Sequence, residues 1–157
     1  MPVIELVTEI AAPIERVFDL SRSIDFHAAC ASDTCERAVA GVTSGLIEAG
    51  QTVTWRARHF GVWQELTVRI TAFDRPNGFT DTMLRGAFQT MEHHHLFQSS
   101  DGGTTMRDSF SYTSPFGMIG RMADTLFLEA HMRSFLIGRN QNIKIAAESD
   151  EWKRYLL

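Results

Sequence analysis

The clearest pattern of hydrophobic and polar positions along the chain lies in residues 88–112. Side chains alternate there with period two on either side of an Asp-Gly-Gly sequence, which is typical of two strands joined by a tight hairpin. A two-residue loop at Asp101 and Gly102 places Ser100 opposite Gly103. The predicted pairs on one face are then Phe97 with Met106, His95 with Asp108, and His93 with Phe110.

Five further segments alternate in the same way and predict strands at residues 2–10, 36–42, 51–60, 63–74 and 79–85. A two-residue turn at Gly61 and Val62 predicts that Trp55 lies opposite Val68. In these segments every second residue is mostly apolar, whereas the charged residues occupy the positions between them. We therefore expect a sheet with one buried face.

The position of Asp81 depends on two turns. With Asp74 opposite Phe79, Asp81 points to the inner face of the sheet. A three-residue loop around Gly86 then places Asp81 opposite His93, whereas a two-residue loop would reverse the parity. We prefer the three-residue loop because it keeps the apolar faces continuous.

Helical patterns lie on both sides of the strand-rich region. Pro13 is suited to the start of a short helix that ends near Ser21, and Ser23 is suited to cap a second helix over residues 24–29. From residue 120 to residue 148 the period becomes 3.6, which predicts one long helix. Its inward stripe contains Leu128, Met132, Phe135, Leu136, Arg139, Ile143 and Ala147.

Arg139 is the one cation within this predicted apolar stripe. A guanidinium that loses its hydration is costly unless a carboxylate replaces the lost water. We therefore predict an ion pair between Arg139 and one of the inner-face aspartates, Asp81 or Asp108.

Length and composition narrow the range of functions. The 157 residues suffice for one domain, which we place at residues 1–148 with a C-terminal tail at 149–157. The net charge is −4 and the 15 Lys and Arg residues are scattered, so neither nucleic acid nor an anionic membrane is an expected partner. No apolar run reaches the ~18 residues of a membrane span, and the N-terminus lacks the pattern of a signal peptide, so we expect a cytoplasmic protein.

The two cysteines carry little functional signal. Cys30 and Cys35 lack the two-residue spacing and the second pair that a zinc site would need. A reducing compartment would keep both as thiols.

The order of elements predicts the α+β class: a curved antiparallel sheet of six to seven strands wrapped around a long C-terminal helix, with two short helices after the first strand. Residues 11–18, with the sequence Ala-Ala-Pro-Ile-Glu-Arg-Val-Phe, resemble the opening motif of the SRPBCC superfamily. This is the START-like, birch-pollen-allergen-like group with the helix-grip fold. The motifs around Trp55, Asp81, His93 and Asp108 resemble a bacterial branch of polyketide cyclase/dehydrase or ligand-binding proteins.

The resemblance implies a deep apolar cavity that holds lipids, sterols, polyketides or quinones. We expect binding of such a hydrophobic small molecule, for transport or sequestration, without any cofactor. The methionines on the inner faces favour a wall that adapts to varied ligands over a rigid core. The predicted ligand-binding residues are Trp55, His59, Asp81, Met83, Met91, His93, His95, Phe97, Met106, Asp108, Phe110, Met132, Leu136 and Arg139.

Two other uses of the same residues stay open. His95 oriented by Asp108 could serve a cyclase or dehydratase as a general acid or base, and His93 and Asp81 are further candidates. His93 and His95 could also face one metal ion, although hydrogen bonds to carboxylates satisfy histidines without metal, so we assign no metal site. The sequence contains no P-loop, dinucleotide-binding glycine motif or serine nucleophile elbow.

The oligomeric state is predicted to be a monomer or a homodimer. The charged outer face of the sheet argues against a large apolar contact surface. Trp63 and Phe73 are expected to share that face, and two copies of the chain could meet through them.

Overall fold

The computed structural model describes residues 1–115, 117–123 and 127–157. Within these ranges, seven strands form one sheet in the spatial order β1-β7-β6-β5-β4-β3-β2, and all neighbouring strands are antiparallel. The strands are β1 (Val3–Ile10), β2 (Arg37–Gly41), β3 (Thr52–His59), β4 (Val62–Asp74), β5 (Gly78–Arg85), β6 (Thr90–Ser100) and β7 (Gly103–Thr113). The helices are α1 (Ile14–Ser21), α2 (Ile24–Cys30), η1 (Ser32–Thr34), α3 (Gly117–Ala123), α4 (Glu129–Glu148) and α5 (Lys153–Leu156).

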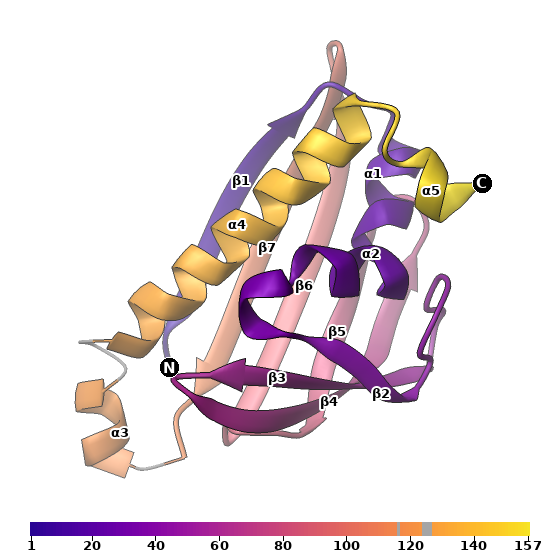
Figure 1. Cartoon of the computed structure of the whole chain (residues 1–157). Coiled ribbons are helices and arrows are strands. Elements are labelled where there is room, and N and C mark those ends of the chain that lie inside the picture. The colour runs from indigo at the N-terminus through magenta and orange to yellow at the C-terminus, as the bar shows by residue number, and fades with distance from the viewer. Residues whose placement is uncertain (116, 124–126) are drawn as a thin grey trace.

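The long helix α4 crosses one face of the curved sheet diagonally, and α1 and α2 lie near its C-terminal half (Figure 1). α3 lies at the other end of α4, away from α1 and α2. This arrangement confirms the predicted α+β class, with a curved sheet against a long C-terminal helix. No helix in the described part of the chain is long and apolar enough to cross a membrane.

The hairpin of β6 and β7 closes with the predicted two-residue loop. Ser100 pairs with Gly103, and Gly102 has a φ of +80°, which glycine adopts without a steric penalty. The register that follows places Phe97 opposite Met106, His95 opposite Asp108, and His93 opposite Phe110, as predicted.

The turn between β3 and β4 is one position earlier than predicted. Phe60 and Gly61 form it, with φ values of 52° and 75°. Positive φ at both central residues matches the twist of a two-residue hairpin. Trp55 therefore pairs with Leu66 and not with Val68. Because the shift is two residues, every side chain keeps its predicted face.

A bulge in β4 was not predicted. Asp74 pairs with Gly78, so the predicted pair of Asp74 with Phe79 is wrong. The register then shifts between Ile70 and Ala72, where one extra residue lies on the β4 side. The extra residue in β4 offsets the one-residue error in the predicted turn, so Asp81 still points to the inner face of the sheet.

The same bulge turns Phe73 towards the core, where its ring meets that of Phe18 edge-on at 5.5 Å between centroids. Trp63 stays on the outer face with about half of its surface exposed (46%). The two side chains therefore do not form the shared outer patch that the sequence predicted.

The loop between β5 and β6 gives the strand register that we preferred from the sequence. Residues 86–89 lie between the two strands, and Asp81 pairs with His93. This register corresponds to the predicted three-residue loop. It brings Asp81 to the same face as the two inward histidines of β6.

The short helices begin where the sequence indicates. Pro13 directly precedes α1, and the side chain of Ser23 accepts a hydrogen bond of 3.2 Å from the backbone N–H of Phe26 at the start of α2. The helix predicted over residues 120–148 is α4 over Glu129–Glu148, while α3 ends at Ala123. Residues 124–126 of that prediction lie outside the described residues.

Residues 149–157, predicted as a tail, pack against the domain through α5 and the residue before it. The ring of Tyr155 meets Phe26 edge-on at 5.1 Å between centroids. The guanidinium of Arg16 lies 4.2 Å from the centre of the Trp152 ring. These contacts attach the end of the chain to α1 and α2.

Candidate ligand-binding cavity

A cavity of about 610 Å³ lies between the inner face of the sheet and α4. Most of its lining is apolar and comes from β3, β4, β6 and the first half of α4. Of the predicted site residues, those that line it are Trp55, His59, Asp81, Met91, His93, His95, Phe110, Met132, Leu136 and Arg139.

The other predicted site residues lie outside this lining. Met106 is fully buried beneath α1, where the hydroxyl oxygen of Ser21 lies 3.8 Å from its sulfur. Phe97 packs edge-on against Phe18 in the same part of the core. Met83 bends back against the turn at Gly86. The alternation along each strand predicts correctly which side chains point to the inner face of the sheet. Because α1 covers one end of that face, not every inward side chain meets the cavity.

Asp108 is the fourth of these residues, and it lies behind the cavity wall. Its side chain has no exposed surface. Nε2 of His93 lies 2.9 Å from its Oδ1, and the side-chain amide of Asn140 donates to its Oδ2 at 2.6 Å. Nη1 of Arg139 lies 3.6 Å from Oδ1, which confirms the predicted ion pair and identifies Asp108 as its carboxylate.

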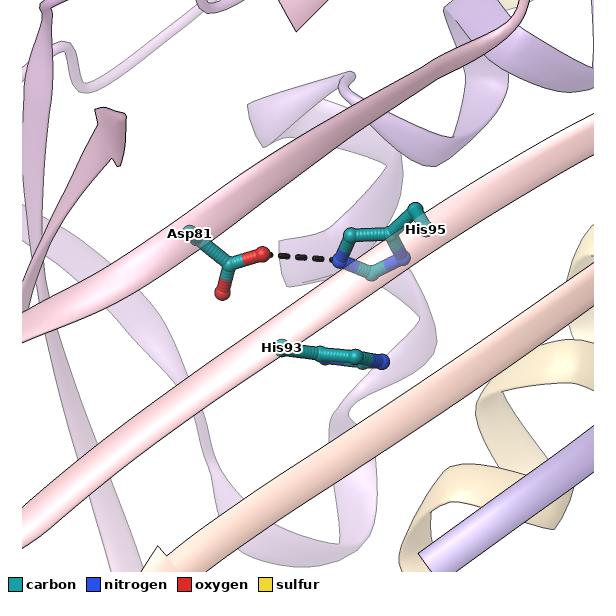
Figure 2. Close-up of side chains that lie close together, drawn as sticks. All are labelled: Asp81, His93 and His95. Carbon is teal, nitrogen blue, oxygen red and sulfur yellow. Dashed lines mark hydrogen bonds and ion pairs between the residues drawn. The ribbon is translucent and has the colours of Figure 1, made fainter. Parts of the chain in front are cut away.

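His95 has a different partner from the one expected. Although it is opposite Asp108 in the register, its Nε2 lies 2.7 Å from Oδ1 of Asp81, as Figure 2 shows. Its Nδ1 is 3.1 Å from Oδ1 of Asp108 but does not meet it at a hydrogen-bonding angle. The rings of His93 and His95 lie 3.8 Å apart between centroids. The four side chains form one polar cluster in the order Asp81, His95, His93, Asp108.

The two histidines of this cluster differ in basicity. Burial and the neighbouring His95 lower the pKa of His93 to about 4, despite its bond to Asp108. Burial also acts to lower the pKa of His95, but the charge of Asp81 and the carboxylate of Asp108 outweigh it and raise this pKa above its usual value. His95 is therefore the more basic of the two histidines.

Both carboxyl groups of the cluster remain ionised. Burial acts to raise the pKa of Asp108, but the bond from His93, the adjacent His95 and the charge of Arg139 hold it well below the usual range. Burial acts on Asp81 in the same direction, and His95 outweighs it, so the pKa of Asp81 is also lowered. Two carboxylates thus share the cluster with one guanidinium.

Sequence reasoning missed a second polar group in the wall. Nε2 of His27 lies 3.1 Å from Oε1 of Glu36, and the ring of His27 rests on Trp55 at 4.2 Å between centroids. Both His27 and Glu36 line the cavity. They come from α2 and from the residue before β2, which have no periodicity that would point them inward.

A third polar pair, formed by two histidines, also lines the cavity. Nδ1 of His59, at the end of β3, lies 3.1 Å from Nε2 of His131 on α4. Phe60 packs beside this pair, with its ring 4.4 Å from that of His131 and 65% of its surface exposed. His131 escaped the sequence analysis because it lies next to the helical stripe.

Known proteins resemble this chain in structure. No protein-family model and no curated protein sequence shows significant similarity to it. Protein TTHA0849 from Thermus thermophilus has a TM-score of 0.73 at 20% identity, over 94% of this chain and 100% of that chain. The chain has the helix-grip fold. This is the fold that the resemblance to the SRPBCC superfamily implied, so the predicted fold is confirmed.

Two further similar structures show how varied the proteins with this fold are. The ginseng major latex-like protein 151 from Panax ginseng has a TM-score of 0.69 at 13% identity, over 94% of this chain and 98% of that chain. The Aha1 dimer from Colwellia psychrerythraea has a TM-score of 0.67 at 14% identity, over 94% and 97%. Because unrelated functions use one fold, the function has to be argued from the cavity.

Proposed function

We propose that this protein binds a hydrophobic small molecule, such as a lipid, a polyketide or a quinone, in the cavity between the sheet and α4. The observation that carries this proposal is the mostly apolar cavity of about 610 Å³. Pockets for small molecules usually measure about 300–1,000 Å³ and combine apolar walls with a few polar groups. Met91 and Met132 add flexible, polarizable side chains that adapt to ligands of different shape.

The polar groups of the cavity wall lie in separate places. The cluster of Asp81, His93 and His95 offers hydrogen bonds on the sheet side, while Glu36 and His27 do so on the α2 side. An amphipathic ligand with one or two oxygen atoms matches such a wall better than a pure hydrocarbon does. Transport or sequestration of such a molecule in the cytoplasm, by a monomer or a homodimer, is the role that we propose.

A fluorescent apolar probe tests this function. N-phenyl-1-naphthylamine gains fluorescence when it leaves water, so saturable binding by the purified protein is expected. Ala57 lines the cavity and is 6% exposed, so Ala57→Trp places an indole inside and should weaken binding by roughly tenfold or more. The control Ala40→Trp adds the same indole at an exposed position of β2 and should bind as the original protein does. Equal affinity of all three proteins would contradict the proposal.

A second candidate function is catalysis by a histidine–aspartate pair in the same cavity. It is favoured by His93, which lines the cavity while its Nε2 is held by the buried Asp108. The version based on His95 and Asp108 needs revision, because Nε2 of His95 is bonded to Asp81. An acid–base role in a cyclisation or dehydration predicts that His93→Gln lowers turnover by roughly 10²-fold or more while ligand affinity is kept. Equal losses of turnover and affinity would identify His93 as a binding residue only.

A further inference from the structure

The side chains of Asp81, His93 and His95 lie close together on the cavity wall (Figure 2). One nitrogen or oxygen atom from each lies within 4.8 Å of the corresponding atoms of the other two. The local structure explains this proximity. His93 and His95 lie two residues apart on β6, so both side chains point inward. Asp81 on β5 is the cross-strand partner of His93. Two histidines two residues apart on a strand, with a third ligand from the next strand, can face a single ion.

The three candidate ligand atoms would have to move closer than the 4.8 Å within which they lie in order to share a first-row metal ion. Bonds of roughly 2.0–2.2 Å from an ion to imidazole nitrogen and carboxylate oxygen place neighbouring ligand atoms roughly 3–3.5 Å apart. Nε2 of His95 and Oδ1 of Asp81 are already 2.7 Å apart. An ion bound between them would release the proton of this hydrogen bond to solvent and would form one coordination bond to each of the two atoms.

Asp108 occupies the place of the outer carboxylate that supports metal-binding histidines. Its Oδ1 lies 2.9 Å from Nε2 of His93 and 3.1 Å from Nδ1 of His95. This leaves Nδ1 of His93 and Nε2 of His95 for coordination. Metal-bound histidines usually donate a hydrogen bond from their second ring nitrogen to a carboxylate, which fixes the ring and its tautomer. Nε2 of His93 is placed to do this, whereas Nδ1 of His95 lies close to Asp108 without a hydrogen-bonding angle. Asn140 and Arg139 hold Asp108 in turn.

The charges around the cluster also favour a cation. Asp81 and Asp108 bring two carboxylates, Arg139 pairs with Asp108, and the metal ion would take the place of the proton that His95 shares with Asp81. Neutral histidines are good ligands for zinc and for iron, and two histidines with one carboxylate leave further coordination positions open. All three candidate ligands line the cavity, so those positions would face its interior.

We propose that Asp81, His93 and His95 bind a divalent transition-metal ion of the Zn²⁺ or Fe²⁺ type, with its open coordination positions directed into the apolar cavity. The ion site itself does not depend on the proposed ligand function. Only one consequence rests on it, namely that a bound ligand with a carbonyl or hydroxyl oxygen can coordinate the ion directly.

Titration with Co²⁺ tests the site on the full chain after treatment with a chelator. Co²⁺ replaces Zn²⁺ in nitrogen and oxygen sites, and its visible absorption reports the coordination geometry. We expect saturable visible bands at one Co²⁺ per chain that Zn²⁺ abolishes by competition. Absence of these bands, together with absence of a Zn²⁺ binding heat in calorimetry, would overturn the proposal.

Variants identify the ligands. His95→Gln and Asp81→Asn should each weaken Zn²⁺ binding by at least roughly 10–100-fold, the effect usual for loss of an outer-shell partner, and Asp108→Asn should fall within that range. The matched control is His94→Gln on the same strand, because His94 bonds to Thr80 at 2.9 Å on the opposite face. Equal affinity in His94→Gln and His95→Gln would overturn the assignment. If a variant does not fold by circular dichroism, the titration of the original protein still decides.

The titration is done without apolar ligand or substrate, so it is independent of the other proposals. A protein that binds Co²⁺ but not N-phenyl-1-naphthylamine would keep the ion site and lose the ligand function. The opposite result would remove the ion site and leave the cavity proposal intact. The proposal of acid–base catalysis uses the same histidines, so it would hold only if no ion binds to them.

Discussion

Replacement of Arg139 by methionine tests the buried ion pair at the centre of the molecule. Arg139 and Asp108 have side chains that are 11% and 0% exposed, and the N–O distance is 3.6 Å. At this distance the Coulomb attraction is about 5 kcal/mol for an effective dielectric constant of about 20. Methionine keeps most of the apolar stem while it removes the charge, together with the hydrogen bonds that Arg139 donates to Asn140 and to the backbone of Ser21.

The net loss should be smaller than the Coulomb attraction. Asp108 keeps its bonds to His93 and Asn140, and removal of Arg139 also relieves the cost of its own desolvation. We therefore expect Arg139→Met to lower the free energy of unfolding by about 3 kcal/mol, at the lower end of the range for breaking a buried pair. Urea denaturation followed by circular dichroism measures the change.

The same helix supplies the matched control. Nη2 of Arg133 lies 3.6 Å from Oε1 of Glu129, the same separation as in the buried pair, but these side chains are 43% and 41% exposed. Water screens an exposed pair, so Arg133→Met should cost about 0–1 kcal/mol. Equal losses in the two variants would refute the claim that burial makes the Arg139 pair important.

A double variant checks that Asp108 is the relevant partner. Asp108→Asn removes the carboxylate charge that Arg139 neutralises, so combining it with Arg139→Met should cost less than the two single losses together. Additive losses would show that Arg139 stabilises the fold through other contacts, such as its 3.5 Å bond to the backbone carbonyl of Ser21.

Three further predictions concern the helices and cysteines, with stability measured by thermal denaturation. Ser23→Ala removes the side-chain cap of Phe26 N–H and should cost about 1 kcal/mol. Gly138→Ala, in the interior of α4 where a Cβ meets no atom within 4 Å, should instead stabilise by about 0.5–1 kcal/mol; a loss would contradict the helix packing. Burial and nearby Glu151 raise the pKa of Cys30 to about 11, so iodoacetamide at pH 8 should modify the exposed Cys35 before Cys30. Mass spectrometry of peptides measures the two rates of modification. Comparable rates would be inconsistent with the burial of Cys30.

The sequence predicts the hairpin of β6 and β7 well because two independent signals agree there. Alternation assigns the inward side chains, and the loop at Asp101 and Gly102 determines the register. Register alone does not determine hydrogen bonds. His95 is opposite Asp108, yet its Nε2 turns to Asp81 on the other neighbouring strand, while Asp108 bonds to His93. An imidazole can reach diagonal neighbours, so such choices depend on packing in three dimensions.

Other features have no local signal in the sequence. The bulge between Ile70 and Ala72 interrupts an otherwise regular alternation, and it moves Phe73 from the outer face into contact with Phe18. Glu36 follows Cys35, whose φ of 52° redirects the chain before β2. That change of direction brings Glu36 into the cavity wall, and a periodicity analysis cannot detect it.

The central claim is that the cavity holds a hydrophobic small molecule. Native mass spectrometry of the full chain, followed by organic extraction and identification of what is released, tests it most directly. We predict a discrete added mass on the original protein and on Ala40→Trp, which disappears in Ala57→Trp, whose indole lies in the cavity. An added mass that persists unchanged in Ala57→Trp, or no binding after exposure to lipids, polyketides and quinones, would contradict the account.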